Sequence, residues 1–195
     1  MTKIIRVDME TKEITQEDAG KYNRYGGRAF IARFLTDEVD PTCEPLGIHN
    51  KLIFCTGLLG GTLLSSSGRL SVGGKSPLTQ GIKEANAGGT AGNDLARHNI
   101  RAVIIERLPA ADDRNSYVLV ISDEGIRLEA MNELEYLGVR DTFKTLRARF
   151  GEKAGVICNG PTGERLMRGA GVAVAAPRGE MRFAARGGMG AVMGS

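Results

Sequence analysis

The chain has 195 residues, of which 42% are hydrophobic and 25% are charged, and its net charge is +3. These proportions are typical of a folded domain with a buried core, and they exclude a disordered or low-complexity chain. Acidic and basic residues are interspersed, and only 5% of the residues are aromatic, with no tryptophan. The sequence therefore offers few stacking platforms and no basic patch, and we expect no nucleic-acid partner.

The hydrophobic pattern predicts an α+β fold in which strands outnumber helices. In chain order, the predicted elements are strands at 4–8 and 13–15, a helix at 28–35, a strand at 51–56, a turn and strand at 63–72, a helix at 94–98, strands at 102–106, 117–121 and 125–129, a helix at 139–150, a strand at 154–158, a tight turn at 159–164 and a strand at 172–175. Strands and helices do not alternate strictly. We therefore predict two packed mixed β-sheets with helices outside them, a four-layer sandwich, rather than a doubly wound sheet.

One arrangement occurs twice in the sequence: an alternating strand is followed by a glycine-rich turn that opens into an apolar helix. The first copy contains the strand 70–72 and the turn 85–92, and the second contains the strand 172–175 and the turn 182–190. Glycine lets the backbone approach a ligand, and the unpaired N–H groups at the start of a helix favour an anion. The repeat predicts an internal pseudo-twofold duplication with two anion sites, which would suit a ligand with two phosphates.

Polar residues near these turns are candidates for binding such a ligand. Arg69 could bind a phosphate with its forked guanidinium, but a solvated arginine at the start of a strand explains the sequence equally well. Arg182 and Arg186 flank the second turn, where an anion between them would offset the repulsion of two like charges. Asn86 is by itself best interpreted as a helix N-cap, with a backbone carbonyl that faces a metal as the alternative.

Other chemistry is not indicated by the sequence. No nucleophile–base set or nucleotide fingerprint occurs, so we predict no catalytic residue in this chain. The three cysteines, Cys43, Cys55 and Cys158, are far apart and indicate neither a disulfide framework nor a metal-binding motif. We expect them to be small buried side chains. No stretch reaches the roughly 18 apolar residues of a membrane span, so we expect no membrane partner and a cytoplasmic location.

Short motifs occur in a fixed order along nearly the whole chain. They include Arg6-Val7-Asp8, Gly26-Gly27-Arg28, Ser67-Gly68-Arg69, Lys75-Ser76-Pro77-Leu78-Thr79, Asn86-Ala87-Gly88-Gly89, Gly160-Pro161 and Arg186-Gly187-Gly188. Together they resemble the N-terminal domain of the tungsten-containing aldehyde ferredoxin oxidoreductase family. The resemblance implies a single N-terminal cofactor-binding domain over residues 1–195, cut before the C-terminal domains of a longer protein or forming one subunit of a divided one.

The resemblance also implies a ligand and the residues that bind it. The ligand is a tungsten or molybdenum cofactor with two pterins, joined through a magnesium ion between their phosphates. The implied cofactor-binding residues are Arg69, Asn86, Ala87, Gly88, Gly89, Arg182, Phe183, Ala184, Arg186 and Gly187. The backbone carbonyls of Asn86 and Phe183 would face the magnesium ion.

The activity that the resemblance implies is the oxidation of aldehydes to carboxylic acids, with electrons passing through a four-iron four-sulfur cluster to ferredoxin or another acceptor. The cluster and the catalytic groups are implied to lie in the C-terminal domains, so we expect this chain alone to be inactive. A stand-alone pterin-binding or scaffold subunit without catalysis is the alternative, and a nucleotide-binding protein that uses the same turns is a third. An exposed cofactor face would also allow a homodimer.

Overall fold

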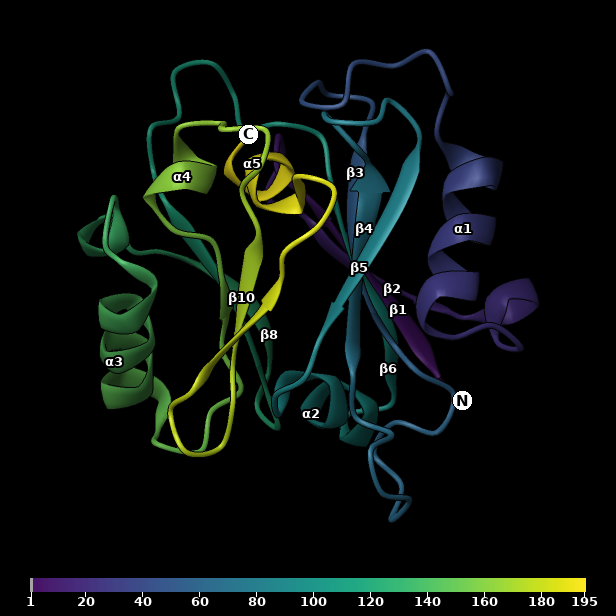
Figure 1. Ribbon diagram of the computed structural model, residues 1–195, viewed down its shortest axis with the longest axis vertical. Coiled ribbons are helices and arrows are strands. Elements are labelled where there is room, and N and C mark those ends of the chain that lie inside the picture. Colours follow the sequence, from purple (N-terminus) through teal and green to yellow (C-terminus); the bar gives the residue numbers. More distant parts are fainter. Residues whose placement is uncertain (1) are drawn as a thin grey trace.

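The computed structural model describes residues 2–195, and its largest element is a mixed six-stranded sheet (Figure 1). In spatial order its strands are β2 (Ile14–Asp18), β1 (Lys3–Asp8), β6 (Ile100–Glu106), β3 (Lys51–Thr56), β4 (Leu70–Lys75) and β5 (Ile82–Ala87). β1 and β6 pair in parallel, and the other neighbours pair antiparallel. Because β5 is an edge strand, part of its backbone is left free for other contacts.

Two small antiparallel sheets form the second layer. One consists of β11 (Met181–Ala184), β10 (Val172–Ala175) and β9 (Ile157–Cys158), and the other is the hairpin of β7 (Tyr117–Ser122) and β8 (Gly125–Ala130). The sequence predicted one mixed sheet here. The layer is instead divided and antiparallel, because short turns join β7 to β8 and β10 to β11, and a short turn can only connect antiparallel strands.

Helices cover both outer faces and give the predicted four layers. α1 (Gly27–Glu38) lies on the large sheet, and α3 (Val139–Phe150) lies on the outer side of the small sheets (Figure 1). The short helices α2 (Ala91–Arg97), α4 (Pro161–Glu164) and α5 (Met189–Gly194) lie toward the ends of the molecule, and η1 (Gly20–Tyr22) and η2 (Asn132–Leu134) are single 3-10 turns. Within residues 2–195, no helix is long and apolar enough to cross a membrane.

The core consists of three hydrophobic clusters between these layers. The central cluster joins the large sheet to the small ones and includes Val72 and Val174, both fully buried. A second cluster lies under α1, where the rings of Phe30 and Phe34 stack with their centroids 5.5 Å apart. The third lies under α3 and includes Phe143. Apolar contacts on both faces of the large sheet therefore hold its strands in place.

The duplicated arrangement is present in the structure, with one addition that the sequence did not predict. In each copy an antiparallel hairpin, β4–β5 or β10–β11, is followed by a glycine turn and a short helix, α2 or α5. The predicted turns at 85–92 and 182–190 include only the last three residues of β5 and of β11, and neither strand was predicted. A further difference is the segment 159–164, which was predicted as a tight turn but contains α4, because Pro161 suits the first position of a helix.

Candidate functional site

A hollow of about 420 Å³ lies where the edge strands β5 and β11 approach each other. It is lined by Arg69, Asn86, Ala87, Gly88, Gly89, Ala176, Pro177, Arg182 and Phe183. Both copies of the duplicated arrangement contribute to this lining. Ala176 and Pro177 were not predicted as site residues, and no sequence signal marks them, because they reach the hollow only through the turn between β10 and β11.

Three of the predicted site residues do not line the hollow. Ala184 is fully buried in the central cluster, and Arg186 is exposed elsewhere on the second turn. Gly187 has a φ of +83°, and a Cβ at this position would collide with the side chain of Lys83. The structure therefore brings together the first glycine turn with Arg182 and Phe183, whereas the glycines of the second turn pack against protein.

The first glycine turn combines an open position with a tightly packed one. An added Cβ at Gly88 would meet no atom within 4 Å, so the backbone there faces free space. Gly89 has a φ of +137°, and an added Cβ would lie 2.6 Å from Cγ1 of Val174 and 2.7 Å from the carbonyl oxygen of Ala175. Gly89 is therefore required for the close approach of this turn to β10.

The predicted N-cap role of Asn86 is wrong. Asn86 lies within β5, opposite Ser71 in the register, and the residue at the N-cap position of α2 is Thr90. The strand extends through Asn86 because the pairing with β4 continues to Ala87. Its side chain is therefore free to contact Arg69 rather than the helix.

A chain of polar side chains supports Arg69 from behind. Arg69 donates from Nε to Oδ1 of Asn86 at 2.6 Å, and Nδ2 of Asn86 donates to Oε1 of Glu84 at 3.4 Å. Glu84 also accepts from Oγ of Ser71 at 2.7 Å and pairs with Nε of Arg28 at 3.0 Å. The sequence analysis missed Glu84, although its position two residues before Asn86 places both side chains on one face of a strand.

The residues that line the hollow favour an anionic ligand. They include two exposed arginines, Arg69 and Arg182, and no carboxylate. The side chain of Phe183 is 47% exposed and adds an apolar surface. Among residues 2–195, no group of three or more His, Cys, Asp or Glu side chains could hold a metal ion. The lining itself contains no His, Cys, Asp or Glu side chain.

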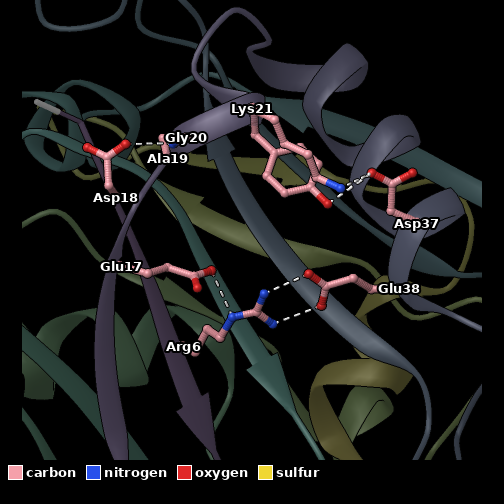
Figure 2. A pocket seen from close by; sticks show the side chains of 9 residues that line it. Arg6, Glu17, Asp18, Ala19, Gly20, Lys21, Asp37 and Glu38 are labelled. Atoms are coloured by element: carbon pink, nitrogen blue, oxygen red, sulfur yellow. Dashed lines mark hydrogen bonds and ion pairs between the residues drawn. The ribbon is translucent and has the colours of Figure 1, made fainter.

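A second hollow, of about 290 Å³, lies between β1, β2, η1 and α1 (Figure 2). Its charged groups pair with one another: Nη2 of Arg6 lies 2.7 Å from Glu38, and its Nε lies 2.9 Å from Glu17. The hydrogen bonds with Glu38, followed by those with Glu17, raise the pKa of Arg6. Asp37 accepts from Lys21 and Tyr22, both at 3.0 Å. These groups form ion pairs with one another, so this hollow is not a candidate for an anion site.

The cysteines are free thiols away from the first hollow. Cys55 and Cys158 are buried as predicted, and burial raises the pKa of both thiols to about 12. Cys43 is only half-buried. Neutral buried thiols are poor nucleophiles and poor metal ligands, which agrees with a structural role.

Comparison with known proteins identifies the family. The model described as "Aldehyde ferredoxin oxidoreductase, N-terminal domain" matches residues 4–195. The chain belongs to this family. The resemblance to this family that was predicted from the sequence is thereby confirmed.

Curated members of the aldehyde ferredoxin oxidoreductase family are similar over the whole chain. The tungsten-containing aldehyde ferredoxin oxidoreductase of Pyrococcus abyssi is 39% identical over 197 residues, and that of Pyrococcus furiosus is 36% identical over 199 residues. Each alignment covers 99% of this chain and 31% of the relative. The chain therefore spans about a third of the length of these relatives.

A solved structure shares the fold. It is the active site complex BamBC of benzoyl coenzyme A reductase in complex with 1,5-dienoyl-CoA, with a TM-score of 0.87 and 26% sequence identity. The similarity covers 98% of this chain and 29% of that one. The α+β architecture predicted from the sequence is therefore shared with part of one chain of that complex.

Proposed function

We propose that this chain is the cofactor-binding domain of a tungsten-dependent aldehyde oxidoreductase and that the hollow between β5 and β11 holds the phosphate-bearing part of a bis-pterin cofactor. The observation that carries this proposal is the lining of the hollow, where both copies of the repeat contribute an arginine and no carboxylate is present. The naming of similar proteins as tungsten-containing enzymes supports tungsten over molybdenum.

The residues present fit such a ligand. Arg69 and Arg182 would bind the phosphates, since a guanidinium matches phosphate oxygens with paired donors. Gly88 would let a phosphate approach the backbone, because nothing occupies the space beside its Cα. Ala184, Arg186 and Gly187 would act by shaping the second turn. When bound, the tungsten centre would accept electrons from the aldehyde.

A magnesium ion between the two phosphates would be held by backbone carbonyls. Asn86 and Phe183 line the hollow from two edge strands, on which part of the backbone has no partner in a sheet. Hard cations such as magnesium prefer oxygen ligands, and one or two protein ligands together with phosphate oxygens commonly suffice. The absence of an acidic cluster among the described residues agrees with this arrangement.

The remaining parts of the reaction would lie outside this chain. We propose that the four-iron four-sulfur cluster, the catalytic groups and the site for ferredoxin belong to C-terminal domains and that the chain alone is inactive. The shared fold with a benzoyl coenzyme A reductase complex supports reduction of a compound of the benzoyl coenzyme A type as a second candidate activity. The higher identity with aldehyde oxidoreductases favours aldehyde oxidation.

The test is the metal and pterin content of the protein, expressed from its complete gene in a host that makes the pterin cofactor and is supplied with tungstate. We expect tungsten with two pterins for each metal, measured by mass spectrometry and by pterin fluorescence after oxidation. Arg69→Ala should lower retention of the cofactor about tenfold or more, because a charge-assisted hydrogen bond contributes roughly 1.5–3 kcal/mol.

Arg140→Ala is the matched control, since Arg140 is an exposed arginine on α3. It should retain the cofactor like the wild type. A wild-type protein that takes up neither tungsten nor pterin would overturn the proposal in favour of a scaffold without catalysis. Equal losses in the Arg69 and Arg140 variants would show that the hollow is not the binding site.

A further inference from the structure

Glu84 is a buried carboxylate directly behind the proposed anion site. Its side chain is only 6% exposed, and it accepts hydrogen bonds from Ser71 at 2.7 Å and from Arg28 at 3.0 Å. A third donor, Nδ2 of Asn86, lies at 3.4 Å. A negative charge behind an anion site opposes binding by Coulomb repulsion. A role other than direct binding of the anion is therefore needed to explain a carboxylate at this position.

The reason lies in the side-chain amide of Asn86. An amide has a donor end and an acceptor end, whereas a carboxylate only accepts and a guanidinium only donates. Asn86 turns Nδ2 toward Glu84 and Oδ1 toward Nε of Arg69, 2.6 Å away. If the amide were rotated by half a turn, it would place oxygen against the carboxylate and NH2 against the guanidinium. Glu84 therefore favours the orientation of Asn86 in which the acceptor end faces Arg69.

The orientation of Asn86 in turn fixes Arg69. Because Nε of Arg69 is engaged by Asn86, the guanidinium is held at its base, and Arg69 lines the hollow beyond it. The terminal nitrogens carry the paired donors that bind phosphate. A held guanidinium loses less conformational freedom on binding than a free one.

We propose that Glu84 is a positioning residue of this site, which acts through Asn86 to hold Arg69 ready for a phosphate group. This inference rests on the proposed function, because it assumes that the hollow binds a phosphate-bearing ligand. Arg28 and Ser71 complete the support, since Ser71 donates to Oε1 and Arg28 to Oε2 of the Glu84 carboxylate.

The test uses magnesium pyrophosphate as the probe and isothermal calorimetry on the full chain. Glu84→Gln keeps the size of the side chain but adds a donor, so the Asn86 amide is no longer held in one orientation. We expect binding to weaken about fivefold to tenfold. Removal of a negative charge alone would strengthen binding instead, so the two explanations predict opposite signs.

A double-mutant cycle shows whether Glu84 acts through Arg69. In an Arg69→Ala background, Glu84→Gln should no longer weaken binding, because the group that it positions is gone and only the loss of a repelling negative charge remains. Glu129→Gln is the matched control, since Glu129 also pairs with arginines but lies on β8. The control variant should bind the probe like the wild type.

The outcomes separate this inference from the proposed function. A wild-type chain that does not bind the probe overturns the phosphate site itself. Wild-type binding with equal or tighter binding by Glu84→Gln overturns only the positioning role. If Glu84→Gln does not fold, as judged by circular dichroism, Asn86→Ala tests the same link, since it leaves Glu84 with Ser71 and Arg28. Unchanged binding by Asn86→Ala would then overturn the positioning role.

Discussion

At the scale of single residues, Gly88 and Gly89 are adjacent but are constrained in different ways. Gly89 has a positive φ and touches Val174, whereas Gly88 faces the hollow. An L-residue at Gly89 would adopt a strained backbone conformation and would also displace β10. The backbone of the first turn therefore depends on Gly89, and the space for a ligand depends on Gly88.

This difference gives a prediction for two neighbouring variants. Gly89→Ala should lower the free energy of unfolding by about 2–4 kcal/mol, because strain and overpacking add. Gly88→Ala should change it by less than about 1 kcal/mol but weaken binding of magnesium pyrophosphate. Urea unfolding followed by circular dichroism measures the first effect, and calorimetry measures the second. Equal destabilisation by the two variants would contradict this account of the turn.

The sequence predicted part of the candidate site at this scale. Arg69, Asn86 and the glycine pair were predicted together, and they do line one hollow. The role of Asn86 as an N-cap was wrong, because the same residue type suits caps and edge strands. Glu84 was missed because its partners Ser71 and Arg28 are brought to it only by the fold. Contacts of this kind are not visible in a local pattern.

At the scale of elements, local periodicity was the reliable signal. The helix predicted at 139–150 is α3, and the strands predicted at 117–121 and 125–129 are β7 and β8. β5 and β11 were not recognised as strands, because they contain small and charged residues with low β-propensity. Pairing with β4 and β10 determines these two strands, and a single sequence does not reveal such pairing.

Helix α3 gives a prediction for the outermost layer. Phe143 and Leu146 of this helix are buried in the cluster between α3 and the small sheets, whereas Lys144 is exposed to solvent. Phe143→Ala should lower the free energy of unfolding by about 3–5 kcal/mol, since it leaves a cavity in the cluster. Lys144→Ala, one residue away, should change it by no more than about 0.5 kcal/mol. Urea titration compares the two, and similar small effects would mean that α3 is not packed on the small sheets.

At the scale of the whole molecule, Arg6 joins three separate segments. From β1 its guanidinium reaches Glu17 of β2, Glu38 of α1 and Glu106 of β6 (Figure 2 shows the first two). The side chain of Arg6 is 19% exposed, so its ion pairs are partly shielded from water. This residue therefore ties the first helix to the sheet beneath it.

Removal of this cation should destabilise the protein. Arg6→Met leaves three carboxylates near one another, with only Lys51 beside two of them. We expect a loss of about 1–3 kcal/mol at pH 7, discounted for partial exposure. Arg6→Lys keeps the positive charge and should lose less stability than Arg6→Met. Urea unfolding measures both variants, and equal losses would argue that packing alone is affected.

The two glycine turns each rest on the other half of the fold. The first lies against β10 at Val174, and the second lies against Lys83 of β5 and accepts a hydrogen bond from Ser76, 111 residues earlier in the chain. Contacts between residues so far apart in the sequence form late in folding, because bringing them together costs the conformational entropy of a long loop. The walls of the hollow should thus be among the last parts to form during folding. A ligand that contacts both turns would then bind only after these long-range contacts have formed.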